Sequence, residues 1–92
     1  MYKVTILPLA EKSLRKFDLI IQERIIKKIE WLAENSDKIV HLALISLPEH
    51  LKGLCRIRVG NYRILYWVYH EERQIKVYNV DHRHKVYKFS KN

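Results

Sequence analysis

The 92-residue sequence has little cysteine, glycine or proline: one cysteine, two glycines and two prolines. A single cysteine excludes an internal disulfide and a cysteine-based zinc site. The scarcity of glycine and proline excludes a collagen-like or linker-like chain. No apolar run approaches the roughly 18–20 residues that span a bilayer, so we expect no membrane segment.

We also expect no secretory signal at the start of the sequence. Its first apolar stretch is short and is soon interrupted by charged residues, whereas a signal needs an uninterrupted apolar region of about 7–15 residues. With a single cysteine, this indicates a protein of the reducing cytoplasm. Hydrophobic residues make up 48% and charged residues 30%, a globular composition. We expect one domain spanning residues 1–92.

Acidic residues are few, and the basic excess is uneven. Lysine and arginine number 18 against 10 acidic residues, a net charge of +8. Residues 1–51 hold eight basic and seven acidic residues, whereas residues 52–92 hold ten basic and three acidic. A chain with one neutral and one strongly basic part favours a polyanionic partner, although a cationic surface that maintains solubility is an alternative.

Apolar spacing predicts an α+β fold. Residues 2–7 alternate as a strand, and Pro8 is well placed to begin a helix. Helical spacing then continues to about residue 35, with a break near Asp18, a favoured cap residue. Strand-like runs follow at 54–59, 62–69 and 74–80. The predicted order is an N-terminal strand, a helical hairpin and a three-stranded antiparallel meander, while residues 36–51 fit either a short helix or an extended segment.

A two-residue loop, Gly60-Asn61, joins the first two strands of the meander and suits a type II′ turn. Because side chains alternate along a strand, this loop places three arginines on the sheet face that points away from the helices. They are Arg56, Arg58 and Arg63. If the alternation is continued into the last strand, four of its residues join this face: Lys76, Tyr78, Val80 and His82.

Three arginines on one sheet face favour a bound anion. Like charges directly opposite each other destabilise a sheet by some tenths of a kcal/mol, and the planar guanidinium binds phosphate through two hydrogen bonds. A solvated face on which arginine stems cover the apolar sheet is the alternative. Trp67 shares the parity of these arginines, so it either packs or stacks on a base.

The C-terminal stretch combines cations with proton-transfer groups. His82 and His84 can donate or accept a proton near neutral pH, and Arg83 can stabilise charge developing on phosphate. Tyr87 suits base stacking or proton transfer. Because no cysteine or acidic residue completes a metal set with the histidine pair, we expect phosphoryl transfer without a metal or other cofactor.

Three segments carry a resemblance to a known family: Leu51–Gly53, Arg56–Tyr66 and His82–Tyr87. Together with the opening strand and helical hairpin, they resemble the RelE/ParE superfamily of bacterial toxin–antitoxin toxins. The resemblance covers nearly the whole chain and implies the RelE-like β-α-α-β-β-β fold.

The RelE-like branch implied by this resemblance is a ribosome-dependent mRNA endonuclease that cleaves the codon in the A site. The messenger's own 2′-OH attacks the adjacent phosphate without a metal, leaving a 2′,3′-cyclic phosphate and a 5′-OH. The resemblance implies catalytic roles for Arg56, Arg58, Arg63, Arg83 and Tyr87, with His82 and His84 as extra candidates. The further residues expected to bind RNA are Lys52, Lys76, Tyr78, Lys85 and Lys88. Arginine at positions 56 and 58, where the family often has lysine, argues against a general base there, because arginine does not deprotonate in proteins.

The resemblance also implies partners. These are a cognate antitoxin, acidic and partly disordered, the ribosome with its mRNA, and operator DNA bound through the antitoxin complex. The alternative is the ParE-like branch, a DNA gyrase poison on the same fold that shares the central V-G-N-Y-R-I-x-Y signal. A plain nucleic-acid-binding module accounts for the charge but not for the clustered His, Arg and Tyr.

Overall fold

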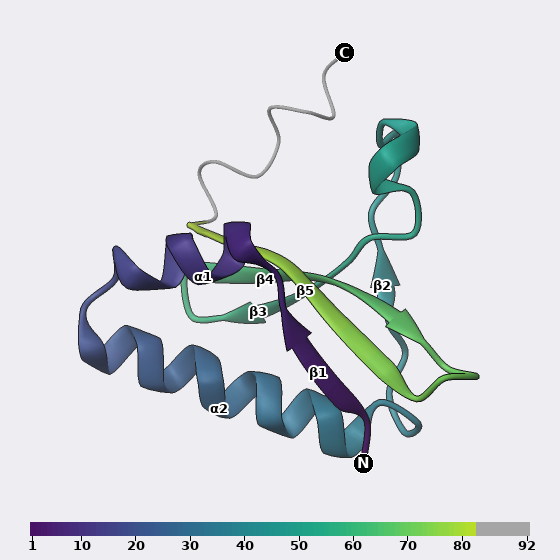
Figure 1. The fold of residues 1–92 in the computed structure, drawn as a ribbon, viewed down its shortest axis with the longest axis horizontal. Helices are drawn as coiled ribbons and strands as arrows, with labels where there is room; N and C mark the ends of the chain where they lie inside the picture. Colours follow the sequence, from purple (N-terminus) through teal and green to yellow (C-terminus); the bar gives the residue numbers. More distant parts are fainter. Residues whose placement is uncertain (83–92) are drawn as a thin grey trace.

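The computed structural model describes residues 1–82. Its elements, in chain order, are β1 (Lys3–Ile6), α1 (Pro8–Arg15), α2 (Leu19–Asn35), β2 (Leu42–Ala43), the 3₁₀ helix η1 (Glu49–Leu51), β3 (Cys55–Val59), β4 (Tyr62–Tyr69) and β5 (Gln74–His82). The strands form one sheet in the order β1-β5-β4-β3-β2 (Figure 1). Strand β1 runs parallel to β5, and the other neighbours are antiparallel. The predicted α+β fold is confirmed, and residues 36–51 contain a two-residue strand and a single 3₁₀ turn.

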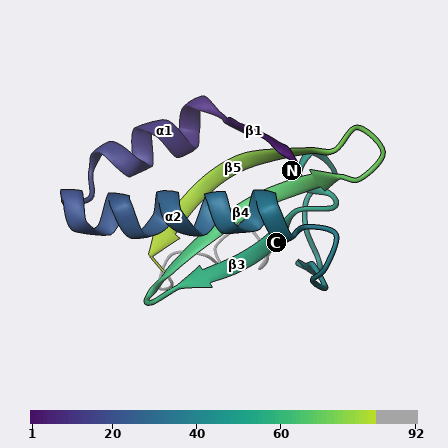
Figure 2. The ribbon, with the colours of Figure 1, turned by 90° about the horizontal axis from the view of Figure 1, so that it is seen from below.

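The helices begin where the sequence predicts. Pro8 is the first residue of α1, a position where its missing N–H costs nothing. Asp18 caps α2, because its Oδ1 accepts a hydrogen bond from the Ile21 N–H at 3.0 Å. Helix α2 lies across one face of the sheet (Figure 2). Helix α1 packs against β5, where the Ser13 hydroxyl donates to Asn79 Oδ1 at 2.6 Å.

The main core lies between the helices and this sheet face. Alternate residues of the strands supply one side of it, as period-2 spacing requires. Its buried members are Tyr2, Ala10, Leu14, Ile25, Ile29, Leu32, Cys55, Ile64, Tyr66, Ile75, Val77 and Val80. Burial raises the pKa of the Cys55 thiol, so this cysteine is a core residue and a poor nucleophile.

The β3–β4 hairpin has the predicted register, with Val59 opposite Tyr62. Gly60 has a φ of +58°, the left-handed region that the first position of a type II′ turn requires. A Cβ at this position would lie 3.0 Å from Nη2 of Arg24 in α2. Gly60 therefore permits both the turn and the close approach of a helix side chain.

Strand β5 does not pair with β4 in one continuous register. Leu65 faces Asn79, whereas the next residue, Tyr66, faces Val77. Tyr78 is therefore an extra residue in β5, a β-bulge. A bulge reverses the alternation of side chains beyond it.

This reversal corrects the predicted faces of Val80 and His82, which do not lie with the arginines. Val80 is 1% exposed, belongs to the main core and pairs with Ile64. The ring of His82 lies edge-on to that of Tyr62, with centroids 5.2 Å apart, on the helix side. The prediction is wrong for these two residues because simple alternation does not account for the extra residue that the bulge inserts.

Tyr66 is buried in the core with a polar partner. Its hydroxyl lies 2.7 Å from His41 Nδ1, and His41 Nε2 lies 2.9 Å from the Ser36 carbonyl oxygen. Because a carbonyl only accepts, Nε2 carries a proton, and in the neutral imidazole Nδ1 accepts from the Tyr66 hydroxyl. Burial raises the pKa of Tyr66.

This raised pKa predicts a loss of stability at high pH. In the unfolded chain Tyr66 ionises near pH 10, so its contribution to the free energy of unfolding is full below pH 10. It then falls by about 1.4 kcal/mol per pH unit. Tyr66→Phe removes this alkaline loss but lowers stability at pH 7 by about 1 kcal/mol, through the lost hydrogen bond. Denaturant unfolding between pH 7 and 11 checks this, and parallel pH curves for the two proteins would contradict it.

Candidate nucleic-acid interface

Strands β3 and β4 place the three arginines on one sheet face, here called the arginine face. Arg58 lies directly opposite Arg63, and Arg56 lies opposite Leu65. The predicted sharing of one face by Arg56, Arg58 and Arg63 is therefore confirmed. Arg58 is exposed and Arg56 half-buried, so both are accessible to a ligand.

Arg63 differs from the other two because it is only 3% exposed. Its partner position on β5 is Asp81, whose Oδ1 accepts a hydrogen bond from the Asn79 amide at 3.3 Å. Asp81 was not predicted to lie here, because simple alternation along β5, without the bulge, places it on the opposite face. A carboxylate beside Arg63 makes this part of the face less positive than three arginines alone would.

An aromatic cluster occupies the same face on the far side of the bulge. Trp67 lies opposite Lys76, and its ring is T-shaped against Tyr78 with centroids 5.4 Å apart. The indole Nε1 donates to the carbonyl oxygen of Lys52 at 3.0 Å, and Gly53, with a φ of +88°, packs beside the ring. The structure thus brings Lys52, Lys76 and Tyr78 together around Trp67, and Lys76 and Tyr78 lie on the face predicted for them.

A cleft lies at the edge of β3 and has a volume of about 410 Å³. Arg56 and Arg58 line it together with aliphatic and aromatic side chains: Ile39, Val40, Leu42, Ile57 and Tyr66. Strand β2 pairs only with Cys55 and Arg56, so the rest of this edge is open within the described residues. Two arginines beside an open strand edge suit an anionic chain, because phosphate accepts hydrogen bonds from guanidinium and backbone N–H groups.

Five predicted site residues lie outside the described residues: Arg83, His84, Lys85, Tyr87 and Lys88. The roles proposed for these five residues stay predictions from the sequence. Among residues 1–82, no three His, Cys, Asp or Glu side chains are grouped so that they could hold a metal ion.

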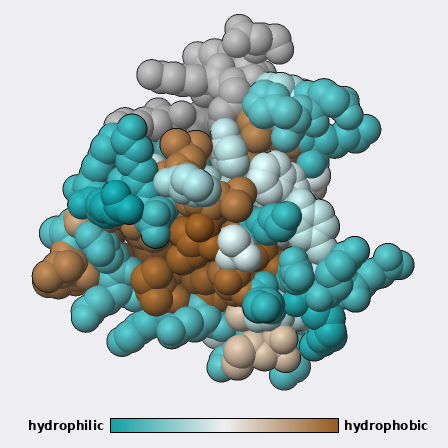
Figure 3. Space-filling view, in the orientation of Figure 1, coloured by the Kyte–Doolittle hydropathy of each residue, from teal (hydrophilic) through white to brown (hydrophobic). Residues whose placement is uncertain are grey.

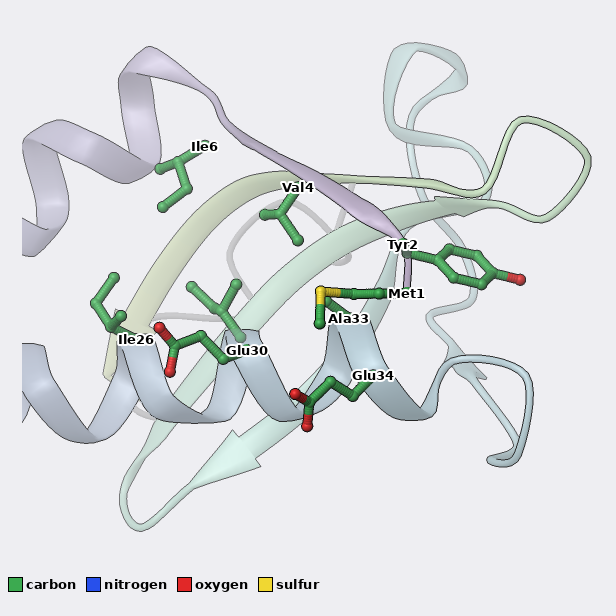
Figure 4. A pocket seen from close by; sticks show the side chains of 9 residues that line it. Met1, Tyr2, Val4, Ile6, Ile26, Glu30, Ala33 and Glu34 are labelled. Atoms are coloured by element: carbon green, nitrogen blue, oxygen red, sulfur yellow. The ribbon is translucent and has the colours of Figure 1, made fainter.

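A second surface feature is an apolar groove between β1 and α2, about 510 Å³ in volume. Figure 3 shows an apolar patch there, ringed by hydrophilic side chains. Val4, Ile6 and Ile26 line the groove, and Glu30 and Glu34 lie along its α2 side (Figure 4). This groove was not predictable from the sequence, because an apolar residue on a helix face is expected in the core, and only the fold shows that it is left uncovered. No helix among the described residues is long and apolar enough to cross a membrane.

A comparison with known protein families identifies the family of this chain. The model of the ParE toxin of type II toxin–antitoxin systems matches residues 4–87. The chain belongs to this toxin family. Membership of the RelE/ParE superfamily, predicted from the sequence, is thereby confirmed. Among curated protein sequences, no relative matches the toxin.

Solved structures of RelE proteins share the fold of the toxin. The RelBE2 toxin–antitoxin complex from Mycobacterium tuberculosis matches with 26% identity and a TM-score of 0.73, covering 89% of this chain and 91% of that one. The isolated Escherichia coli RelE toxin matches with 25% identity and a TM-score of 0.70, covering 89% and 84%. The archaeal RelE–RelB complex from Pyrococcus horikoshii, at 21% identity and a TM-score of 0.66, covers 92% and 98% and shows the fold alone.

Proposed function

We propose that the toxin is a ribosome-dependent mRNA endonuclease that inhibits translation in the cytoplasm. One observation carries this proposal: Arg56 and Arg58 stand side by side on β3, accessible to a ligand, and line a cleft at an open strand edge. Such a site suits a single-stranded nucleic acid, whose phosphates meet guanidinium groups while its sugars and bases meet apolar side chains. The likeness to RelE structures at 25–26% identity supports the same branch.

The proposed chemistry is attack of the messenger's 2′-OH on the adjacent phosphate. The new O–P bond forms as the bond to the 5′ oxygen breaks, which leaves a 2′,3′-cyclic phosphate and a 5′-OH. Arg56 and Arg58 stabilise the extra negative charge of the transition state, with Arg63 and Arg83 completing the positive field. Because arginine does not deprotonate, proton transfer is assigned to His84, with Tyr87 stacking on a base or sharing that role.

A second candidate function is poisoning of DNA gyrase. The matching family model describes the ParE toxin of a parDE system, and this observation favours it. Such a toxin binds a protein and needs no catalytic arginines. The two candidates therefore differ in what happens to mRNA.

Mapping the 5′ ends of cellular mRNA after induced expression tests the proposal. An endonuclease acting in the A site produces new 5′ ends within translated codons, in frame with the start codon. Untranslated RNA stays intact. A gyrase poison leaves the mRNA intact and induces DNA damage, and that result would replace the proposed function with the second candidate.

We propose a cognate antitoxin as the partner that inhibits the toxin. Three of the RelE and YoeB structures that share the fold are named as complexes with an antitoxin. An acidic, partly disordered segment complements the basic half of the chain and folds as it binds. The apolar groove between β1 and α2 takes the apolar residues of that partner, because exposed apolar patches of this kind mark protein interaction sites. Operator DNA is bound through the antitoxin.

This assignment predicts the effect of Ile26→Asp, a change on the groove wall. A carboxylate at this position prevents an apolar side chain of the antitoxin from packing in the groove, a contact that contributes about 1.5–3 kcal/mol to binding. We therefore expect antitoxin binding to weaken about 10- to 100-fold. Ile45→Asp is the matched control, because Ile45 is 81% exposed and lies outside the groove. Calorimetric titration with purified antitoxin measures both. Equal affinity for Ile26→Asp and the parent would remove the groove from the antitoxin interface.

A further inference from the structure

A second basic cleft lies between α2 and the end of β3, with a volume of about 390 Å³. It is lined by Arg24, Lys27, Lys28, Trp31, Arg58 and Val59. Four of these six side chains are cationic and none is acidic. Only Arg58 belongs to the proposed catalytic site.

The fold assembles this cleft from separate parts of the sequence. Positions 24, 27 and 28 are three or four residues apart, so their side chains share one face of α2. That face meets the edge of β3 where Arg58 projects. The first half of the chain is nearly neutral overall, so its composition does not reveal this concentration of charge.

Arg24 and Lys28 each lie close to a neighbouring group of the fold. The Arg24 guanidinium lies over the β3–β4 turn, where a Cβ on Gly60 would come within 3.0 Å of its Nη2. The Lys28 ammonium lies 4.1 Å from the centre of the Trp31 ring, a cation–π contact that orients it. Neither contact neutralises a charge. Within residues 1–82, no carboxylate forms an ion pair with any of the four cations.

This cleft is continuous with the cleft at the edge of β3 that Arg56 lines, because Arg58 lines both. Beyond Arg56, β3 has no strand partner on its β2 side among the described residues. The cations therefore follow an open edge from Arg56, past Arg58, to the face of α2. A track of this kind fits successive phosphates of one chain better than a single small anion.

We propose that the cleft of Arg24, Lys27, Lys28 and Arg58 is a docking site for the sugar–phosphate backbone of folded RNA. This inference rests on the proposed function, which makes that RNA ribosomal. The cleft holds the toxin on the ribosome, while the arginine face acts on the messenger. The three cations on α2, Arg24, Lys27 and Lys28, should contribute to ribosome binding and to its salt dependence without taking part in bond cleavage.

The test compares two triple variants of equal net charge. The α2 variant removes the three cations of the helix by combining Arg24→Gln, Lys27→Gln and Lys28→Gln. The control variant removes three exposed lysines elsewhere by combining Lys3→Gln, Lys12→Gln and Lys16→Gln. Binding to purified ribosomes is measured across a range of salt concentrations. Each lost phosphate contact lowers the slope of log K against log salt by about 0.7–0.9, so the α2 variant should lose about 2–3 from the slope and at least about tenfold in affinity. The control variant should keep the parent's slope.

A second measurement separates this inference from the proposed function. At saturating ribosome concentration the α2 variant should cleave mRNA at the parent's rate, while its half-saturating ribosome concentration rises. If the parent cleaves mRNA and the α2 variant binds ribosomes as the parent does, the docking site is wrong and the proposed function stands. Loss of antitoxin affinity with unchanged ribosome affinity also overturns the inference, because it makes the cleft a protein-binding site. If the parent neither binds ribosomes nor cleaves mRNA, both proposals fail.

Discussion

Arg58→Ala is expected to reduce ribosome-dependent mRNA cleavage by about 10²–10³-fold, the usual effect of losing one preorganised group that stabilises transition-state charge. Arg56→Ala should act similarly, because both side chains line the same cleft. Both residues are at least partly exposed, so the variants should remain folded and should relieve growth arrest. Single-turnover cleavage on programmed ribosomes measures the effect.

Lys12→Ala in α1 is the control for this experiment. It removes one exposed positive charge on the helical hairpin, so it should remain toxic. Arg63→Ala is a less informative probe than the sequence suggests, because Arg63 is 3% exposed and its loss also disturbs the packing of β4. Folded Arg56→Ala and Arg58→Ala variants that cleave as fast as the parent would show that the arginine face is not the catalytic site.

The two neighbouring histidines should differ sharply in effect. His84→Ala is expected to slow cleavage by about 10²–10⁴-fold, because it removes the proposed acid/base group. It should also remove one limb of the pH–rate profile. His82→Ala should leave the rate close to that of the parent, because the His82 ring packs against Tyr62 on the helix side of the sheet.

Comparing rates from pH 5 to 9 for the two variants distinguishes chemistry from structure. A His82→Ala variant that loses activity as far as His84→Ala does, while remaining folded, would return the acid/base role to His82. A His84→Ala variant with an unchanged pH profile would leave Tyr87 as the proton-transfer group.

Local patterns in the sequence determine most of the fold, and they were predictable for that reason. The meander strands begin and end within two residues of their predicted bounds, because alternation and a two-residue loop fix both ends of a hairpin. Asp18 and Pro8 mark helix starts through their own backbone preferences. Arg56, Arg58 and Arg63 share a face because the Gly60-Asn61 loop sets their register.

Features that depend on contacts distant in the sequence were not predictable in this way. The bulge at Tyr78 leaves no local mark, yet it moves Val80 and His82 to the helix side and Asp81 to the side of Arg63. Alternation along the strands correctly predicted that the three arginines share a face, but it did not predict that Arg63 is buried. Alternation indicates on which face of the sheet a side chain lies, and not which other residues cover it.

The basic cleft on α2 was missed for the same reason. Arg24, Lys27 and Lys28 look like an ordinary solvated helix face in the sequence, and only the packing of α2 beside β3 brings them to Arg58. The parallel pairing of β1 with β5 also could not be predicted from local patterns, because most of the chain lies between the two strands.

The most direct test of the proposed function uses purified ribosomes programmed with a defined mRNA and a vacant A site. The toxin is added, and the products are examined for a cut inside the A-site codon with a 5′-OH end that a polynucleotide kinase can label without prior dephosphorylation. We expect this cut with the parent protein, about 10²–10³-fold less of it with Arg58→Ala, and none on the same mRNA without ribosomes. An intact messenger, together with inhibition of purified DNA gyrase by the same preparation, would contradict the account.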